Sequence, residues 1–360
     1  MKIERVELFA LRLPLRTPFI SGGNSTDYRD LGVLRLTDED GRAGVGEITP
    51  YPDPIAPPLE DLIAAFEGGA REQLLDAEIF DHGLTLDTKL PATVESAIDI
   101  ALLDLLARRE EIRVAELIGT SVQEDVAVNA TITALDPDEV AALGERAVEA
   151  GFSTIKLKVG FSSEDGERLE ALRDAVGFQT LIRLDANGSW YTAEAIDQIA
   201  EFQEFGLELI EQPVAPDDLA SMHRVRDASM VPIVADEGVR TVADLDLHVA
   251  NGACDGVAIK LAQVGGITSA SILAGNASKA GLLTFVTSTL DGPVGLAAGL
   301  HFAAARSDFS VANGLATGGL FEESYAFGLP EVIDGALQLT DAPGLGIELD
   351  EDALLDLSIS

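Results

Sequence analysis

The sequence predicts an α/β protein, with a (β/α)8-type (TIM-like) barrel and an α+β capping domain formed by the N-terminal region and the C-terminal tail. Apolar runs and helical segments alternate eight times after residue 125, as expected for parallel strands that are buried on both faces. An ionisable residue closes five successive runs at intervals of 27, 26, 25 and 24 residues, about the length of one strand, one helix and two loops. These residues are Lys158, Asp185, Glu211, Asp236 and Lys260.

The N-terminal part predicts a small sheet followed by helices. Residues 2–15 alternate charged and apolar side chains and predict a strand, which a polar loop with two glycines follows. Two further strands, over residues 31–37 and 43–48, are joined by the turn DEDGR. A proline-rich connector ends the sheet, and apolar residues at helical spacing predict a helix over residues 93–109. We therefore predict a capping domain over residues 1–124.

The barrel is predicted over residues 125–325, and the tail over residues 326–360 is expected to return to the cap. Glycine follows four of the predicted helices, at the position where it often ends a helix. The eight predicted barrel strands cover residues 126–132, 153–159, 180–185, 207–211, 231–236, 256–262, 283–289 and 309–316.

The composition narrows the classes of partner and compartment. A net charge of −38 argues against nucleic acid and anionic membranes as partners, because both would repel this surface. The sequence shows no signal peptide and has a single cysteine, Cys254, which fits a reducing compartment. We therefore expect a cytoplasmic protein that acts on a small molecule. A homo-oligomer is compatible with this composition. The acidity and the scarcity of lysine further indicate a halophilic organism with a high-salt cytoplasm.

The charge leads to a prediction about salt. Self-repulsion among 62 acidic side chains should destabilise the folded chain at low ionic strength, and salt should screen it. We expect the melting temperature to rise markedly between dilute buffer and molar KCl, measured by circular dichroism. A flat or falling melting temperature would show that the acidity has another cause.

Lysine is rare in this chain, yet it is concentrated at the predicted strand ends. Three of the six lysines, Lys156, Lys158 and Lys260, end predicted barrel strands. Lys156 and Lys158 are two residues apart and therefore share one face of a strand. Two adjacent ammonium groups disfavour each other's charged form, so one amine can accept a proton. The alternative is an exposed strand end with solvated lysines, which the neighbouring carboxylates argue against.

Three carboxylates are predicted to converge at the same rim. Asp185, Glu211 and Asp236 end three consecutive strands, and three oxygen donors without histidine or cysteine suit Mg²⁺, or Mn²⁺ as a close substitute. The alternative is three salt bridges to arginine, for which only Arg183 and Arg240 lie near.

The remaining predicted groups surround this centre. Lys260 would lie opposite Lys158, where a cation can stabilise an enolate or donate a proton. Asn187 follows Asp185 by two residues and could orient a ligand, whereas Glu237 is expected to face the other side of its strand. None of the four histidines falls at a strand end, so a His–Asp pair is not the predicted base.

These motifs resemble the enolase superfamily, in its muconate-lactonizing-enzyme subgroup. The resemblance covers nearly the whole chain and rests on the cap, KxK, DANG, EQPV, ADEG and the lysine after the sixth strand. It implies a bound Mg²⁺ that stabilises the enediolate formed when a proton α to a carboxylate is removed. It also implies that Asp185, Glu211 and Asp236 are the ligands, and that Lys158 and Lys260 flank the substrate carbon.

Within that subgroup the chain most resembles o-succinylbenzoate synthases. The segment TSTLDGPVGLAAGL is similar to the serine-led segment of those enzymes, and NGLATGGLF is similar to their segment after the eighth strand. Dipeptide epimerases carry Asp-x-Asp there, where this chain has Ala-Asn-Gly. We therefore expect a lyase of menaquinone biosynthesis that dehydrates a cyclohexene carboxylate, with Lys158 as base and Lys260 as a fixed cation. Expected substrate contacts are Asn187, Ser288, Asp291 and Thr317.

Several alternatives remain open at this point. A muconate or chloromuconate cycloisomerase, or an N-acylamino acid racemase, would use the same residues. The complete ring of lysines and carboxylates argues against a non-catalytic barrel. A lysine Schiff-base aldolase would not need three converging carboxylates and should survive chelation by EDTA. The surface that selects the substrate is predicted at the cap loops over residues 21–27 and 49–53, whose residues do not indicate a particular substrate.

Overall fold

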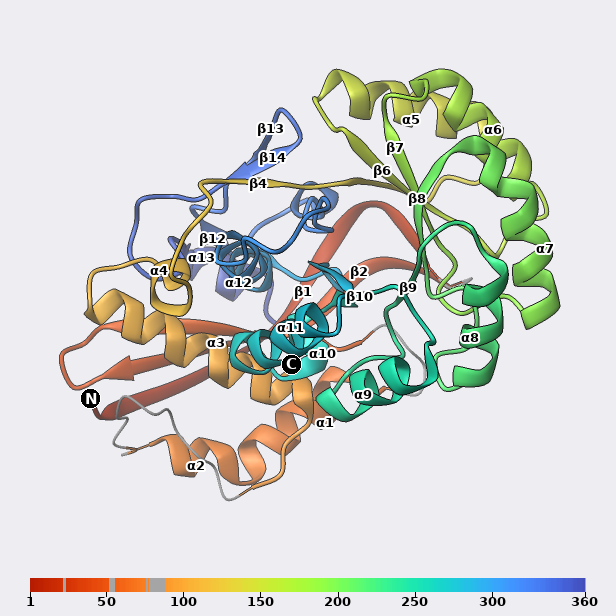
Figure 1. The fold of residues 1–360 in the computed structure, drawn as a ribbon. Helices are drawn as coiled ribbons and strands as arrows, with labels where there is room; N and C mark the ends of the chain where they lie inside the picture. Colours follow the sequence, from red (N-terminus) through yellow and green to blue (C-terminus); the bar gives the residue numbers. More distant parts are fainter. Residues whose placement is uncertain (22–23, 52–55, 76, 78–87, 360) are drawn as a thin grey trace.

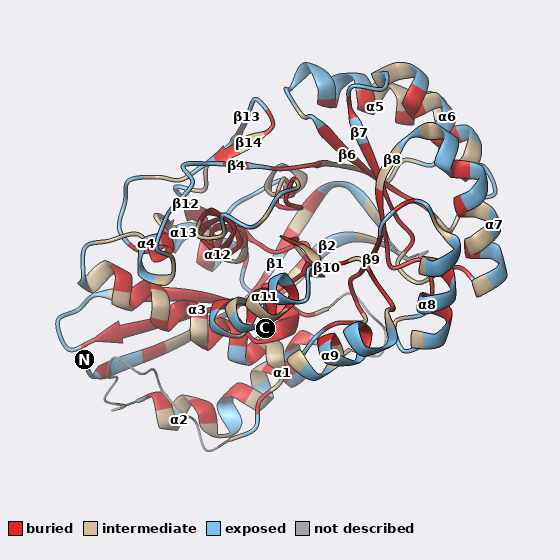
Figure 2. Ribbon diagram, viewed as in Figure 1, coloured by how far each residue is buried: buried red, intermediate tan, exposed pale blue. Residues whose placement is uncertain are grey.

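The computed structural model of this chain consists of a cap built on an antiparallel sheet and a barrel built on a parallel sheet (Figure 1). Helices α5, α6, α7 and α8 lie outside the parallel strands, and Figure 2 shows their buried faces turned toward the sheet and their exposed faces turned outward. The structure describes residues 1–21, 24–51, 56–75, 77 and 88–359.

The cap sheet is larger than its predicted strands. It contains β1 (Ile3–Ser21), β2 (Asn24–Asp38) and β3 (Ala43–Ile48) in the order β1-β2-β3. Part of the predicted polar loop, from residue 24 onward, belongs to β2. The reason is that a register shift after Pro14 lets β1 and β2 continue to pair, up to the partners Ser21 and Asn24.

Helix α3 (Ala92–Arg109) packs closely on this sheet, in good agreement with the prediction of a helix over residues 93–109. Two glycines of β3 allow the close approach: a Cβ atom at Gly46 would lie 1.8 Å from the carbonyl oxygen of Ala97, and one at Gly44 would lie 2.3 Å from that of Ala101. The other helices of this part are α1 (Leu59–Ala65), η1 (Phe66–Ala70), α2 (Arg71–Leu74) and α4 (Val114–Ile118).

The barrel sheet has seven parallel strands in the order β11-β10-β9-β8-β7-β6-β5. Its strands are β5 (Ala130–Ile132), β6 (Thr154–Lys158), β7 (Leu181–Asp185), β8 (Leu207–Glu211), β9 (Ile233–Ala235), β10 (Gly256–Ile259) and β11 (Leu283–Val286). Its helices are α5 (Pro137–Glu149), α6 (Asp165–Val176), α7 (Thr192–Phe202), η2 (Gln203–Phe205), α8 (Leu219–Ala228), α9 (Val242–Asn251), α10 (Leu261–Val264), α11 (Ile267–Lys279) and α12 (Pro293–Ala304).

Several predicted strands differ from the structure. The first, over residues 126–132, is divided into β4 (Asp125–Ala127), which pairs with a strand of the tail, and β5 of the barrel sheet, and the seventh ends at Val286. The sixth ends at Ile259 because α10 begins at Leu261. The eighth, over residues 309–316, is reduced to two isolated bridges, from Asn313 to Val128 and from Gly314 to Thr287. These bridges join the two edges of the seven-stranded sheet. The side-chain oxygen of Asn313 accepts a hydrogen bond from the backbone of Val286 at 3.0 Å, in place of a regular ladder bond.

The tail contacts both parts of the chain. Its strands are β12 (Ala326–Phe327), β13 (Val332–Ile333), β14 (Ala336–Gln338) and β15 (Glu348–Leu349), and its helix is α13 (Glu351–Asp356); η3 (Gly318–Leu320) precedes the tail. Strand β14 pairs with β4 (Asp125–Ala127) at the start of the barrel. Ser358 forms an antiparallel bridge with Leu11, on the edge strand β1 of the cap. The division into residues 1–124, 125–325 and 326–360 remains a prediction.

Among the residues that the structure describes, no helix is both long enough and apolar enough to cross a membrane.

A buried histidine between cap and barrel gives a prediction about pH. Nδ1 of His301, on α12, accepts a hydrogen bond from the backbone of Ala115, on α4, at 3.1 Å. Burial lowers the pKa of His301 to about 4, so the folded state favours the neutral ring. Below pH 6.5, about the pKa of histidine in an unfolded chain, the unfolded protein binds a proton that the native protein does not. Stability should therefore fall by about 1.4 kcal/mol per pH unit from this group, between roughly pH 6.5 and 4.

The variant His301→Asn keeps an acceptor for Ala115 but cannot titrate. We expect its free energy of unfolding, measured with urea between pH 7 and 5, to depend less on pH than that of the wild type. Parallel curves for the two proteins would contradict a buried neutral His301.

Candidate active site

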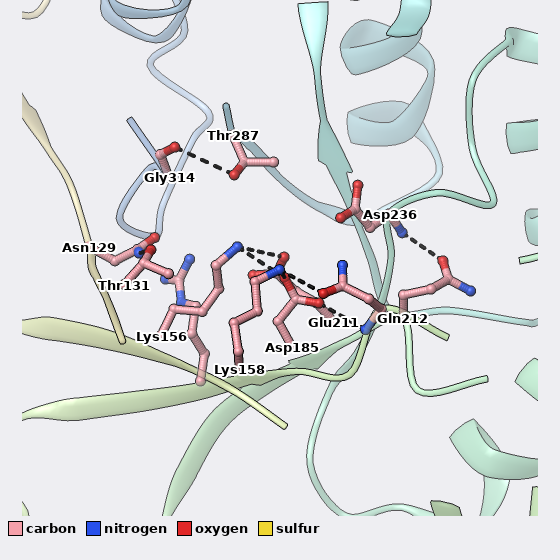
Figure 3. Close-up of polar contacts among 12 residues, drawn as sticks. Asn129, Thr131, Lys156, Lys158, Asp185, Glu211, Gln212, Asp236, Thr287 and Gly314 are labelled. Atoms are coloured by element: carbon pink, nitrogen blue, oxygen red, sulfur yellow. Dashed lines mark hydrogen bonds and ion pairs between the residues drawn. The ribbon is translucent and has the colours of Figure 1, made fainter. Parts of the chain in front are cut away.

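Four of the five predicted rim residues are seen to meet at one end of the parallel sheet in Figure 3, namely Lys158, Asp185, Glu211 and Asp236. Lys158, Asp185 and Glu211 are the last residues of β6, β7 and β8, and the sheet register places Lys158 beside Asp185 and Asp185 beside Glu211. Asp236 directly follows β9, and Lys260 directly follows β10. The nearly constant spacing in sequence thus corresponds to neighbouring positions in space.

The three carboxylates form a compact, buried group. Asp185, Glu211 and Asp236 each offer an oxygen, and these oxygens lie within 4.8 Å of one another. The three residues are at most 1% exposed. Oε1 of Glu211 and Oδ1 of Asp236 are buried and have no hydrogen-bond partner among the described residues. Buried carboxylate oxygens without donors are costly, and a divalent cation that prefers oxygen ligands would satisfy them. The residues present therefore fit Mg²⁺.

Three lysines pair with these carboxylates. Nζ of Lys158 lies 2.7 Å from Oδ2 of Asp185, and Nζ of Lys260 lies 2.5 Å from Oδ2 of Asp236. Nζ of Lys156 lies 3.2 Å from both Asp185 and Glu211. Each ammonium group therefore touches a carboxylate that could also bind a cation.

The alternative of salt bridges to arginine is not what the structure shows. The guanidinium of Arg183 binds Glu208 at 2.7 Å and the carbonyl oxygen of Ala312 at 2.9 Å. Arg240 donates to the carbonyl oxygen of Glu237 at 3.1 Å. Neither arginine has a described contact with the three carboxylates.

The lysines and the burial shift the titration of the carboxylates in opposite directions. Burial alone would raise the pKa of Asp185, but the charges of Lys158 and Lys156 hold it well below its usual range. Burial, together with the charge of Glu237, raises the pKa of Asp236 to about 7. The group as a whole concentrates charge that is shielded from water, which is typical of a catalytic centre.

A cavity of about 360 Å³ opens beside this centre. The cap contributes Phe19, Ser25, Thr26, Arg29 and Tyr51 to its lining. The barrel contributes Thr131, Lys156, Lys158, Asn187, Lys260, Thr287, Ser288, Thr289, Leu290, Gly314 and Thr317. Among the described residues that line it there are four cationic side chains and no carboxylate.

The predicted substrate contacts fall into two groups. Asn187, Ser288 and Thr317 line the cavity, and the hydroxyl of Thr317 donates to that of Ser288 at 3.1 Å. Asp291 is not among the lining residues. Its carboxylate instead accepts hydrogen bonds from the hydroxyl and the backbone of Thr289, at 2.9 and 3.3 Å, and so holds the loop after β11.

The predicted cap loops contribute to the cavity where the structure describes them. Ser25 and Thr26, within residues 21–27, and Tyr51, within residues 49–53, line it. Residues 22–23 and 52–53 of these loops lie outside the described residues.

The prediction from the sequence did not include Gln212, and it placed Glu237 on the wrong side of its strand. Gln212 has a left-handed backbone (φ 35°), and its side-chain oxygen accepts from the backbone of Asp236 at 3.0 Å (Figure 3). The same oxygen accepts from the backbone of Gly238 at 3.2 Å. Gln212 therefore fixes the loop that carries Asp236, and its place directly after Glu211 was the available signal. Glu237 does not simply face away, because its carboxylate accepts a hydrogen bond from Asn187 at 2.8 Å.

Comparisons with known proteins agree with this architecture. Residues 4–119 match the N-terminal domain of the mandelate racemase / muconate lactonizing enzyme family, and residues 139–353 match the enolase C-terminal domain-like family. The chain is 30% identical over 367 residues to N-succinyl-L-Arg/Lys racemase of Bacillus cereus, covering 100% of this chain and 98% of that protein. The crystal structure of that racemase has a TM-score of 0.92 to this chain, at 28% identity, and covers 100% and 99% of the two chains.

Two further solved structures are similar. The dipeptide epimerase of Enterococcus faecalis, in complex with Mg and the dipeptide L-Leu-L-Tyr, has a TM-score of 0.89 at 27% identity, covering 97% of this chain and 100% of that one. The muconate lactonizing enzyme of Pseudomonas fluorescens, in complex with muconolactone, has a TM-score of 0.93 at 26% identity, covering 99% of each chain.

These comparisons correct the predicted reaction. The expectation of a lyase that dehydrates a cyclohexene carboxylate to o-succinylbenzoate is wrong, because the similar proteins are racemases, epimerases and a cycloisomerase. The physical reason lies in the two segments on which that expectation rested. They supply Ser288 and Thr317, hydroxyls in the cavity wall that could contact many carboxylate substrates and do not distinguish one reaction from another.

Proposed function

This chain belongs to the mandelate racemase / muconate lactonizing enzyme family of the enolase superfamily, and from that premise we propose that it racemises an N-acylamino acid. The observation that carries the proposal is the pair Lys158 and Lys260, which border the cavity beside two different carboxylates, Asp185 and Asp236. Inversion at a carbon requires one group to remove the α-proton and a second group to return a proton from the opposite face.

The roles of the residues follow from this reaction. One lysine, as a neutral amine, takes the α-proton, and the other, as an ammonium, delivers a proton to the other face. For the reverse reaction the two lysines exchange roles. Asp185, Glu211 and Asp236 would hold Mg²⁺, or Mn²⁺ as a substitute, and Lys156 would balance their charge from the side of β6. When bound, the cation supplies positive charge that stabilises the negative charge developing on the substrate carboxylate.

The cavity wall supports the substrate class. A dipeptide carries a free ammonium group, which would need an anionic partner, and the described lining residues offer none. The amide of an N-acylamino acid is uncharged, and its carbonyl oxygen can accept from the hydroxyl of Ser288, which accepts from Thr317 and keeps its own hydrogen for a ligand. By the same reasoning we propose a neutral amino-acid side chain, because a basic one would stay unpaired.

The test is α-proton exchange in D₂O with Mg²⁺, followed by NMR. We expect exchange and racemisation of N-acetyl- and N-succinyl-L-methionine, slower exchange of N-succinyl-L-arginine, and little exchange of L-Ala-L-Glu. Faster exchange of the dipeptide would contradict the proposal. Formation of a lactone from cis,cis-muconate, without exchange of any N-acylamino acid, would instead favour a cycloisomerase, which the similarity to muconate lactonizing enzyme also supports.

A further inference from the structure

A chain of hydrogen bonds connects the cap to Lys158 and does not include Lys260. The hydroxyl of Tyr51, directly after the cap sheet, donates to Oε1 of Glu237 at 2.9 Å. The same oxygen accepts from Nδ2 of Asn187 at 2.8 Å, and Oδ1 of Asn187 accepts from Nζ of Lys158 at 2.7 Å. Four residues from the cap and from three strand ends of the barrel are thus connected in series.

Glu237 determines how the amide of Asn187 is oriented. A carboxylate can only accept hydrogen bonds, so it selects the orientation in which the NH₂ group of Asn187 points toward Glu237 and the oxygen points toward Lys158. The backbone of Asn187 is fixed as well. It has a left-handed conformation (φ 44°), and its N–H donates to Oδ1 of Asp185 at 3.1 Å. The amide oxygen is therefore held in place for Lys158.

Stability alone does not account for Glu237. The side chain is only 9% exposed, and its second oxygen, Oε2, is buried without a hydrogen-bond partner among the described residues. A buried, unpaired carboxylate oxygen lowers stability. Lys260 has no comparable link through hydrogen bonds: its Nζ pairs with Asp236 and lies 5.6 Å from the centre of the Tyr51 ring, whereas Glu237 acts on it only through its charge.

We propose that Glu237 is a positioning residue for Lys158, which acts through Asn187 and is anchored to the cap by Tyr51. The inference rests on the proposed racemisation, in which each lysine serves one face of the substrate carbon. When Lys158 takes the α-proton it becomes an ammonium, and Oδ1 of Asn187 accepts one of its hydrogens. Glu237 is therefore linked by hydrogen bonds to the lysine that removes the proton at this face, and no described hydrogen bond links it to Lys260.

The experiment compares the two enantiomers separately. The variant Lys158→Ala first identifies the enantiomer of N-acetylmethionine whose α-proton Lys158 removes. In Glu237→Gln the amide of residue 237 can donate as well as accept, so the orientation of Asn187 is no longer fixed. We expect α-proton exchange of that enantiomer in D₂O to fall by about tenfold, and exchange of the other enantiomer to change much less. Tyr51→Phe should shift the ratio in the same direction by about threefold, because it removes one hydrogen bond.

A second glutamate of the barrel, Glu208, provides a matched control. Glu208→Gln changes a partly buried glutamate that does not line the cavity and pairs with Arg183 at 2.7 Å, and it should lower the melting temperature without altering the ratio. Equal loss of exchange for both enantiomers in Glu237→Gln, or no loss, would show that Glu237 is only structural.

If the wild type exchanges neither enantiomer, the proposed function fails while the positioning can still be tested. In protein labelled with ¹⁵N-asparagine, the NH₂ signal of Asn187, identified by its absence in Asn187→Ala, should move in Glu237→Gln and stay in place in Glu208→Gln. An unmoved signal would overturn the positioning role.

Discussion

Replacing Lys158 with alanine is expected to abolish racemisation, whereas one of the two enantiomers should still exchange its α-proton with solvent. A positioned acid–base group contributes about 10²- to 10⁴-fold to a rate, and inversion needs two such groups, so the turnover number for racemisation should fall by at least about 100-fold. The enantiomer whose α-proton faces Lys260 should still exchange with D₂O, because Lys260 can remove and return a proton on its own face. Polarimetry follows racemisation, and NMR follows exchange of each enantiomer.

The variant Lys260→Arg should also lose racemisation, but it should keep exchange of the opposite enantiomer. Arginine keeps the positive charge beside Asp236, but it cannot deprotonate near neutral pH, so it cannot act as a base. Exchange at the face of Lys260 should be lost, whereas exchange at the face of Lys158 should persist. The exposed Lys279, at the end of α11, provides a control in which Lys279→Ala changes neither reaction. Full racemisation by Lys158→Ala or by Lys260→Arg would contradict the assignment of the two lysines.

Removing a carboxylate from the cation site should have the second largest effect. In Glu211→Gln a neutral amide replaces a buried carboxylate that is 0% exposed and lies within 4.8 Å of two others, and we expect a loss of activity of at least about 100-fold. The binding of a cation to the folded state also raises stability according to its concentration and dissociation constant. Addition of Mg²⁺ to chelated wild-type protein should therefore raise the melting temperature, and Glu211→Gln should show little or no rise.

The control for this experiment lies on the same strand. Glu208→Gln removes a carboxylate of β8 that contacts Arg183, so it should keep the melting-temperature response to Mg²⁺ even if its overall stability is lower. Full activity of the wild type after exhaustive chelation would disprove the proposed role of the cation.

Much of the site could be predicted because barrel geometry converts sequence period into spatial proximity. In a parallel sheet the strand ends lie at one edge, so residues that end successive strands, such as Lys158, Asp185 and Glu211, become neighbours. The apolar runs before them located the strands.

The parts that could not be predicted depend on contacts between distant segments. The continuation of β1 past Pro14 depends on its pairing with β2, and the shortened eighth strand depends on Asn313 replacing a ladder bond with its side chain. The link from Tyr51 to Glu237 joins the cap to the barrel across 186 positions of the sequence, and no local pattern signals it. The type of reaction could not be predicted from the local segments either, because Ser288 and Thr317 make the cavity wall polar and take no defined part in a chemical step.

The pairing of β1 with the tail has a consequence for biosynthesis. Ser358 bridges Leu11, and the backbone of Ile359 donates to Ala10 at 2.9 Å, although these residues lie near opposite ends of the sequence. A ribosome adds about 5–20 residues per second, so β1 must wait until the barrel has been translated before its outer edge is covered. An unfinished chain therefore presents an open strand edge, which invites pairing with other chains or recognition by chaperones and proteases. Strand β1 also carries Phe19 of the cavity wall, so the edge that the tail covers belongs to a strand that helps to line the cavity.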